Sequence, residues 1–569
     1  RPASRSNDMK IAVIADPHFH DTMSWPGREG PAFRSFADSI ASTRVFNESG
    51  PALRALLDDI VRRGISLVIV AGDLSDDGQR ATMAKTVALF EDYTRRYGLR
   101  FLAAPGNHDL YAIHGRHHSK RFLNGDGSHV LVTSDKDALQ GDSVARLVTE
   151  DMYCGGYARA LADMASFGFF RQAADRHWES PFGDEDDLDK RSFIIRSADG
   201  ATKRRMIDAS YLVEPVDGLW VLSLDANVFE PRNGDLDPTA EASYHDSTSA
   251  GWNAMLRHKP FILDWMRDVA RRAQERGKRL VVFSHYPMIN PSNGALADEI
   301  GLFGNGESLR RVPVRAVAEA VAATGIKVHF GGHLHVNHTA VFHDAGDFLV
   351  NVAVPSMVAF PPAYKLVEVA AERLAVETVM IDGVPGYDTA FPFYRAEADC
   401  EELTAARDHA DFLDRHLALL VRERYLPKEW PEDLARLAPL LSLDELERLA
   451  GETSSLLAEE IGSRASDGQL TFLDMITDWY RLRKANSLAL DFIASERLAR
   501  YRALVRRYRT GKAWLPGSLQ ARLAKFMRLM GASLDGNPSV DFTIDLRDGA
   551  VEDLAIHLGR TDRRQTGGA

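Results

Sequence analysis

In the first hundred residues, the spacing of hydrophobic positions switches between the pattern of buried strands and the pattern of amphipathic helices. Short apolar runs at residues 11–15, 67–71 and 101–104 have the length of buried β-strands. Between them, residues 53–63 and 82–97 place apolar side chains every three or four positions, which is the period of an amphipathic helix. Strands that alternate with helices in this way are typical of βαβ units, so the pattern predicts a parallel sheet with helical crossovers.

The pattern becomes irregular and polar between about residues 110 and 211, where basic residues, histidines and the acidic run 184–187 gather. We interpret this stretch as a long insert that packs over the ends of the preceding strands, with solvent-facing decoration as the plain alternative. His117 and His118 lie within it, and we expect both at the surface rather than in a site.

Strands return after the insert. Residues 211–225 are predicted to form two strands joined by a turn at Asp217-Gly218, and the apolar runs 280–283 and 328–330 predict further buried strands. Many short strands and few helices in this part indicate a second sheet. We therefore expect residues 9–383 to form one α/β domain.

A change in composition marks the end of that domain. Residues 384–393 contain prolines and glycine, and beyond residue 397 apolar stripes predict helices over residues 401–425, 431–440, 443–459, 471–484 and 488–509. Four or more such helices predict a bundle. Residues 540–546 and 551–558 alternate around a turn, which predicts a terminal β-hairpin. We assign residues 397–560 to a C-terminal helical domain that ends in this hairpin.

The helical domain also carries a basic run between residues 481 and 509. Its arginines could form a face that steers phosphates or docks a partner. We favour the simpler interpretation, a solvated helix face whose charges are paired with nearby carboxylates.

Composition and charge describe an ordinary globular chain. Its 569 residues are 45% hydrophobic and 26% charged, with a formal net charge of −12. The acidic balance argues against broad electrostatic binding to nucleic acid or anionic membranes. No apolar run approaches the roughly 18–20 residues of a membrane span. Nucleic acid is thus an unexpected partner, and no membrane span is predicted.

Two cysteines are too few for a disulfide framework, although one bridge is an open alternative. No segment near the start has the form of a signal peptide. We therefore expect a cytoplasmic protein, with a cleaved leader as the open alternative.

Side chains that bind metals follow five of the predicted strands. They are Asp16, His18, Asp73, Asn107, His285, His333 and His335. Strand ends of an open α/β sheet meet at one rim, so we expect these residues to converge on one site. Carboxylate, imidazole and amide ligands suit manganese, iron or zinc. A carboxylate can bridge two ions about 3.5–4 Å apart, and Asp73 is the natural bridge.

A single motif of this kind is weak evidence. Asp-X-His or His-X-His alone usually marks a capped turn or a hydrogen-bonded imidazole. Here five such patches occur together, each after a strand, and four carry a glycine beside or just before a ligand, where the backbone must turn sharply. We therefore predict a dinuclear metal centre, with manganese or iron favoured and zinc as the alternative.

At these residues the chain resembles the calcineurin-like metallophosphoesterase superfamily. The resemblance implies a fold of two mixed sheets packed face to face and flanked by helices, here followed by the helical bundle and terminal hairpin. It also implies two ligand sets that share Asp73. One ion would be bound by Asp16, His18 and His335, and the other by Asn107, His285 and His333.

The same resemblance implies roles next to the metals. Asn107 and His108 would contact the substrate phosphate, and His108 would act as general acid for the leaving oxygen, with Asp76 as its partner. His18 distinguishes the chain from the purple acid phosphatases, which lack this histidine. The long insert, the strand at residues 219–227 and the appended helices are most similar to bacterial class III cyclic-nucleotide phosphodiesterases.

These observations lead to a functional hypothesis. We expect a dinuclear metal-dependent phosphoesterase that hydrolyses a small phosphodiester, a cyclic nucleotide being favoured, by attack of a metal-bridging hydroxide. The alternatives are a phosphomonoesterase or nuclease of the same superfamily, or a non-catalytic protein-binding scaffold. We expect the C-terminal domain to pack beside the metal rim and shape access; the alternative is that it forms a homo-oligomer.

Overall fold

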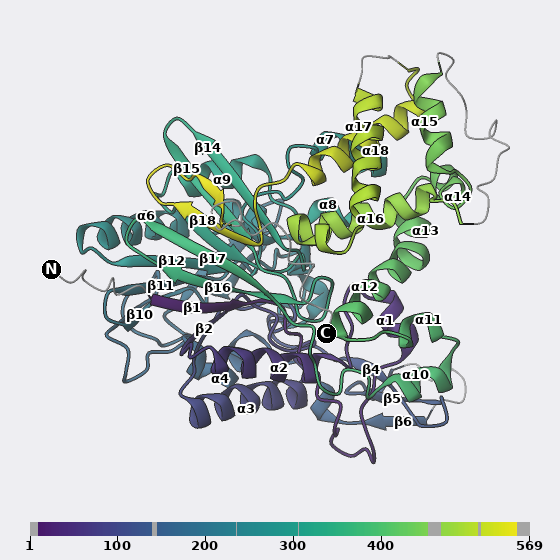
Figure 1. The fold of residues 1–569 in the computed structure, drawn as a ribbon. Helices are drawn as coiled ribbons and strands as arrows, with labels where there is room; N and C mark the ends of the chain where they lie inside the picture. Colours follow the sequence, from purple (N-terminus) through teal and green to yellow (C-terminus); the bar gives the residue numbers. More distant parts are fainter. Residues whose placement is uncertain are drawn as a thin grey trace.

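The computed structural model describes residues 9–138, 145–234, 236–304, 306–452, 468–509 and 514–554. Two seven-stranded sheets lie at its centre, and a group of helices stands to one side (Figure 1). The first sheet has the order β19 (Val551–Asp553), β18 (Asp541–Asp545), β17 (Arg373–Met380), β16 (Ala363–Val369), β1 (Met9–Ile14), β2 (Leu67–Val70) and β3 (Arg100–Ala103).

The predicted βαβ units build one half of this sheet. β1, β2 and β3 run parallel, and α2 (Ser49–Arg62) and α3 (Arg80–Tyr97) connect them. The remaining neighbours pair antiparallel, so the sheet is mixed. All four residues of β2 are buried, as expected for a strand covered on both faces.

The second sheet is also mixed. Its order is β14 (His338–Asp344), β15 (Asp347–Ala353), β13 (Val328–Gly331), β12 (Arg279–Ser284), β11 (Leu219–Leu224), β10 (Tyr211–Val216) and β7 (His177–Glu179). β11, β12, β13 and β15 run parallel. The helices α5 (Gly251–His258) and α6 (Pro260–Glu275) lie between β11 and β12, and α7 (Leu296–Phe303), α8 (Glu307–Arg310) and α9 (Arg315–Ala322) lie between β12 and β13.

The two sheets share one hydrophobic core. Where they meet, the hydroxyls of Tyr211 and Ser223 in the second sheet donate to the carbonyl oxygen of Ala103 in β3, at 2.8 and 3.2 Å. The predicted fold class, two mixed sheets with flanking helices and a C-terminal helical region, is confirmed.

The insert contains more regular secondary structure than its sequence predicts. It contains a three-stranded sheet of β4 (Ser119–Leu123), β5 (His129–Thr133) and β6 (Ala145–Val148), the helix α4 (Tyr157–Asp163), and the hairpin of β8 (Ser192–Arg196) and β9 (Lys203–Ile207). None of the four residues of β6 is buried, so this strand lacks the apolar alternation that would have predicted it.

The helical region follows β17. Its α-helices are α10 (Phe391–Glu397), α11 (Glu401–Thr404), α12 (His409–Leu420), α13 (Leu426–Glu429), α14 (Glu432–Leu437), α15 (Leu443–Gly451), α16 (Phe472–Ala485), α17 (Ser495–Arg509) and α18 (Leu519–Leu534). A π-helical turn, Val421–Tyr425, joins α12 to α13. A helix predicted over 401–425 is thus interrupted, because Asp408 caps a new helix by accepting from Asp411 N at 2.8 Å.

Two further differences concern this region. The helix predicted over 443–459 ends at Gly451, and residues 453–459 lie outside the described residues. The helix α18, which begins after the N-cap Ser518, was not predicted. Most of the basic run is paired with carboxylates, as expected; examples are Arg481 with Asp414 at 2.6 Å, Arg497 with Asp478 at 2.6 Å and Arg507 with Glu447 at 2.6 Å.

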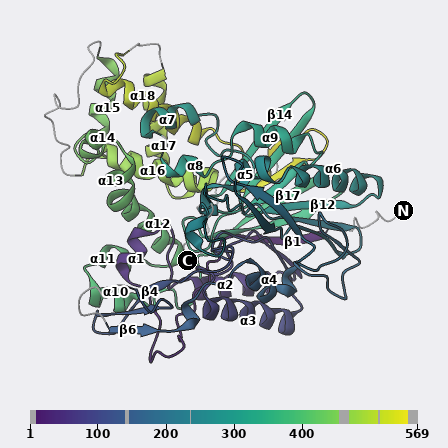
Figure 2. The same cartoon turned by 180° about the vertical axis from the view of Figure 1, so that it is seen from behind.

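The terminal hairpin does not belong to the helical region. β18 pairs antiparallel with β17, so β18 and β19 extend the first sheet, and the chain returns to that sheet after the helices (Figures 1 and 2). Residues 555–558 of the predicted second strand lie outside the described residues. Within the described ranges, no helix is long and apolar enough to cross a membrane.

Candidate metal centre

The seven predicted ligands all follow the carboxyl end of a strand. Asp16 and His18 follow β1, Asp73 follows β2, Asn107 follows β3, His285 follows β12, and His333 and His335 follow β13. Five have a left-handed backbone, with φ of 50° at Asp16, 42° at His18, 53° at Asp73, 69° at His333 and 51° at His335. The described residues include only three other non-glycine cases. Such strained conformations gather at functional sites, so their concentration here marks this rim.

Glycines let the ligand loops approach one another. A Cβ on Gly72 would lie 2.5 Å from His285 Nδ1, and one on Gly106 would lie 2.0 Å from Asp73 Oδ1. A Cβ on Gly332 would lie 2.3 Å from Asp16 Oδ2. The motif glycines therefore leave the space that the ligand side chains occupy.

A first cluster joins Asp16, His18 and His335. The Nε2 atoms of the two histidines are 3.1 Å apart. Asp16 Oδ1 lies 3.4 Å from His335 Nε2 and 3.9 Å from His18 Nε2. Two ring nitrogens and a carboxylate oxygen thus face a common point, as the ligands of one ion would.

A second cluster joins Asn107, His285 and His333. His285 Nε2 lies 3.0 Å from Asn107 Oδ1 and 3.2 Å from His333 Nδ1. The other nitrogen of His285, Nδ1, donates to the carbonyl oxygen of Ala71 at 2.9 Å. A backbone partner of this kind orients a ligand histidine and directs its second nitrogen to the metal.

Asp73 lies between the two clusters. Its Oδ2 is 3.6 Å from His18 Nε2 and 3.2 Å from His285 Nε2. Its Oδ1 accepts a hydrogen bond from the backbone N–H of His108 at 2.8 Å. This position between both clusters is the one that a bridging carboxylate requires.

The electrostatics of the site suit cations. Burial lowers the pKa of His18 and His333 well below its usual value, so both rings are neutral. Burial acts to raise the pKa of Asp73, but the charges of His285 and His108 outweigh it and hold that pKa well below its usual range. Burial acts to lower the pKa of His285, but Asp73 raises it to about 9. Neutral imidazoles around an ionised carboxylate fit metal binding, which would displace the proton of His285.

Two of these rings are also poor in protein hydrogen bonds. Among the described residues, His18 Nδ1 and His333 Nε2 are buried without a hydrogen-bond partner. The same holds for His338 Nδ1 and His409 Nδ1 outside the site, so it is the donor types and the facing nitrogens that fit a pair of borderline metal ions.

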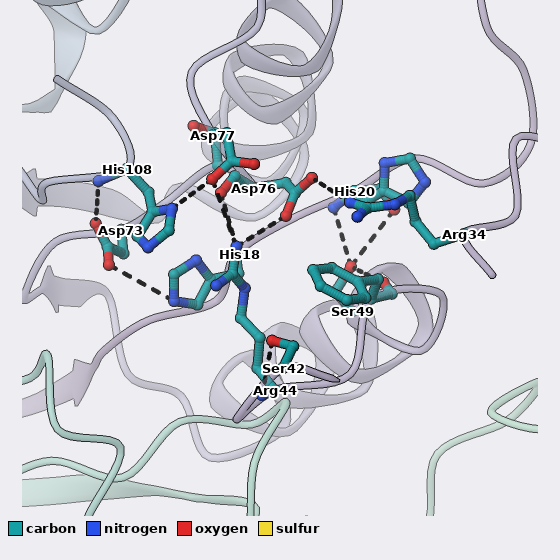
Figure 3. A network of polar contacts seen from close by, with 12 residues as sticks. His18, His20, Arg34, Ser42, Arg44, Ser49, Asp73, Asp76, Asp77 and His108 are labelled. Atoms are coloured by element: carbon teal, nitrogen blue, oxygen red, sulfur yellow. Dashed lines mark hydrogen bonds and ion pairs between the residues drawn. The ribbon is translucent and has the colours of Figure 1, made fainter. Parts of the chain in front are cut away.

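His108 is the most open histidine of the group, with 22% of its side chain exposed. Its ring meets that of His18 edge-on, with centroids 4.8 Å apart. Its Nδ1 lies 2.5 Å from Asp77 Oδ1, so Asp77 is its partner, and the predicted pairing with Asp76 is wrong (Figure 3).

The reason is that the Asp76 carboxylate is already engaged. It contacts Arg44 Nη2 at 2.9 Å, Lys120 Nζ at 3.2 Å and Arg34 Nη1 at 3.3 Å. The chain then turns through the left-handed Gly78 and leaves Asp77 next to His108.

The insert supplies two residues that we did not assign to the site. His118 Nε2 lies 3.1 Å from Asp77 Oδ2, and the ammonium of Lys120 bonds the same carboxylate. His118 has 14% of its side chain exposed, so its predicted surface position is wrong, whereas His117 is exposed as expected. Their spacing of two residues, which puts His118 and Lys120 on one side of an extended chain, was the available signal.

Two further contacts fix the ligand loops. Asp109 accepts hydrogen bonds from the backbone N–H groups of Ser75 at 2.9 Å, Leu74 at 3.0 Å and Gly106 at 3.2 Å, and so ties two loops together. On the other side, Lys484 in α16 donates from Nζ to Leu334 O at 3.0 Å. Leu334 lies between His333 and His335, so the helical region touches a ligand loop directly.

Comparison with known protein families supports the interpretation of these residues as a phosphoesterase site. Residues 9–196 match the family model of the calcineurin-like phosphoesterases. This part of the chain is thus similar to the calcineurin-like phosphoesterases, and the match supports a phosphoric ester hydrolase. Comparison with curated proteins gave no match.

Similar solved structures share little sequence with the chain. A dimetal phosphatase from Danio rerio is 12% identical over 65% of this chain and 95% of its own, with a TM-score of 0.29. A purple acid phosphatase from yellow lupin (Lupinus luteus) seeds is 13% identical over 66% and 52%, with a TM-score of 0.28. The Thermus thermophilus sulfate thiohydrolase SoxB is 14% identical over 70% and 61%, with a TM-score of 0.29. Similarity at this level carries no argument about the substrate.

Proposed function

We propose that this chain is a two-metal phosphoesterase that hydrolyses a small phosphodiester, with a cyclic nucleotide as the favoured substrate. The observation that carries the proposal is the pair of ligand clusters around Asp73, whose Oδ2 lies 3.6 Å from a nitrogen of one cluster and 3.2 Å from a nitrogen of the other. The preference for a cyclic nucleotide rests on the resemblance of the insert and the appended helices, quoted above.

Each cluster would hold one ion. Asp16, His18 and His335 would bind the first, Asn107, His285 and His333 the second, and Asp73 both. Oxygen and imidazole ligands suit manganese, iron and zinc, and we favour manganese or iron, with zinc as the alternative. Two bound ions supply positive charge to the phosphoryl oxygens and lower the pKa of the attacking water.

The protein's own contribution centres on His108. With Asp77 Oδ1 at 2.5 Å from its Nδ1, the ring is held in a fixed orientation. Nε2 would then give its proton to the leaving alkoxide while Asp77 stays ionised. An alkoxide is a poor leaving group without a proton, so this role has the greatest value on an alkyl diester such as a cyclic nucleotide.

A substrate panel tests the proposal. Protein loaded with manganese, iron or zinc would be assayed on an aryl phosphodiester, an aryl phosphomonoester, 3′,5′- and 2′,3′-cyclic nucleotides and single-stranded DNA, with His108→Ala as a control for contaminating activity. We expect the highest kcat/KM on a cyclic nucleotide. Preference for the monoester would replace the substrate assignment, and two bound ions without hydrolysis of any ester would refute the function.

A further inference from the structure

Arg44 brings a buried guanidinium to the edge of the candidate metal centre. It follows α1 (Phe36–Ala41), outside all the ligand loops, and is 8% exposed. Figure 3 shows its guanidinium beside the ring of His18, on the side that faces Asp76 and Asp77. No motif in the sequence marks this residue.

The hydrogen bonds of Arg44 leave one of its nitrogen donors without a partner. Nη2 donates to Asp76 Oδ1 at 2.9 Å and to Asp76 O at 3.0 Å. Nε is buried and has no hydrogen-bond partner among the described residues, as is also the case for Nε of Arg100 and Arg191. What distinguishes Arg44 is its place beside His18, where an oxygen of a bound ligand would satisfy this donor.

Arg34 provides an internal comparison. Both arginines contact the Asp76 carboxylate, and both lie over the ring of Phe46, with Cζ 4.2 Å from its centroid for Arg34 and 5.2 Å for Arg44. Arg34, however, also has Asp38, whose Oδ2 accepts from its Nε at 3.1 Å. The Nε of Arg34 is therefore satisfied within the protein, and the Nε of Arg44 is not.

Arg44 also lies next to the proposed acid's partner. Its Nη2 is 3.6 Å from Asp77 Oδ1, the carboxylate that contacts His108. The guanidinium therefore stands beside both the ligand His18 and the Asp77–His108 pair (Figure 3).

We propose that Arg44 binds a non-bridging oxygen of the substrate's phosphate group, as a specificity-determining residue of the proposed reaction. The inference rests on the proposed function. A guanidinium presents planar, rigidly spaced donors that match phosphate oxygens, which a lysine ammonium cannot reproduce. The competing explanation is that Arg44 only anchors the loop of Asp76.

Paired substitutions distinguish these explanations. Arg44→Lys and Arg34→Lys keep the charge near Asp76, and only the first removes the free donor. Metal content would be measured by mass spectrometry, affinity for inorganic phosphate by calorimetry, and kcat and KM on an aryl phosphodiester. We expect Arg44→Lys to keep its metals and lose roughly ten- to hundredfold in phosphate affinity, while Arg34→Lys stays close to wild type.

Equal phosphate affinity of the two metal-loaded variants would overturn the proposal. If Arg44→Lys does not fold or loses its metals, the wild-type protein crystallised with metals and inorganic phosphate decides. A phosphate oxygen hydrogen-bonded to Arg44 supports the proposal, and a phosphate on the metals but out of reach of Arg44 contradicts it. Phosphate binding is measured without turnover, so a failure of the proposed hydrolysis would be recognised separately.

Discussion

The ligand loops and the helical region meet at the candidate metal centre, yet they are held in different ways. The loops are fixed by their own backbone: strand ends, glycines and five left-handed ligand residues. The helical region is fixed by contacts between residues far apart in the sequence, such as Lys484 with Leu334. The positions of the ligands are therefore determined mainly by the sequence of each loop, whereas the surroundings of the site depend on tertiary contacts.

Other contacts of the helical region show the same character. The ring of His409 in α12 donates from Nε2 to Met357 O at 2.8 Å, and that of His416 donates to Ser39 O at 2.8 Å. The region also begins and ends on the first sheet, at β17 and β18. A chain cut near residue 382 would therefore lose two edge strands together with the helices, and it would not test the helices alone.

The largest effect should come from removing the carboxylate of Asp73, which both ligand clusters share. We predict that Asp73→Ala abolishes activity and removes both ions, because the charge that both clusters share is lost. Elemental analysis of the folded variant checks this. Asp137→Ala, which removes an exposed carboxylate in the insert, is the control and should retain the metals.

A smaller loss should follow from changes at the proposed acid. His108→Ala should slow hydrolysis of an alkyl diester by about 10²–10⁴-fold while the metals stay bound. Asp77→Asn should act in the same direction and less strongly, because it only orients the ring. The defect should shrink on an aryl ester, whose leaving group does not require a proton. Equal losses on both esters would make His108 a structural residue.

Removing a contact of the helical region should have a milder effect on the metals. Lys484→Met deletes the donor to Leu334 O and keeps the length of the side chain. Metal release from the variant, followed with a chromogenic chelator, should be several-fold faster, because the loop of His333 and His335 loses support. Arg483→Met, which removes the neighbouring ion pair with Glu299, is the matched control. Unchanged release in Lys484→Met would show that the loop is held by its own backbone alone.

The smallest effect concerns acid stability at the contact of α12. Burial lowers the pKa of His409 and of His416 from 6.5 to about 4. The unfolded chain takes up protons first, so the free energy of unfolding falls as the pH drops from about 6.5 to 4, by about 2 kcal/mol per histidine at pH 5. His409→Gln should therefore melt with less pH dependence between pH 7 and 5, whereas Gln at the exposed His117 should leave the wild-type slope.

The same comparison explains how far the sequence predicts the structure. The strands before Asp16, Asp73 and His285 were predicted because apolar runs of strand length end at a ligand. The sequence could not decide between Asp76 and Asp77, since the choice depends on which carboxylate the cations of the insert and of the segment after α1 engage. Both carboxylates lie in the same loop, one residue apart.

The sequence also does not predict which strands pair when they lie far apart in the chain. Alternation in residues 541–545 predicts a strand but does not name its neighbour, and the partner β17 lies more than a hundred residues earlier in the chain. His118 and Lys120 were missed although they share one side of the extended chain with the buried Phe122 of β4, because a single apolar residue among polar ones does not establish a strand period. The helix α18 was not predicted, although its apolar stripe and the N-cap Ser518 could be recognised in the sequence.

The central claim is that one site holds two ions with Asp73 between them. The most direct test is a crystal structure of the manganese-loaded protein with anomalous scattering data. We predict two peaks, one bounded by Asp16, His18 and His335, the other by Asn107, His285 and His333, with Asp73 bound to both ions. A single peak, or two ions that do not share Asp73, would contradict it.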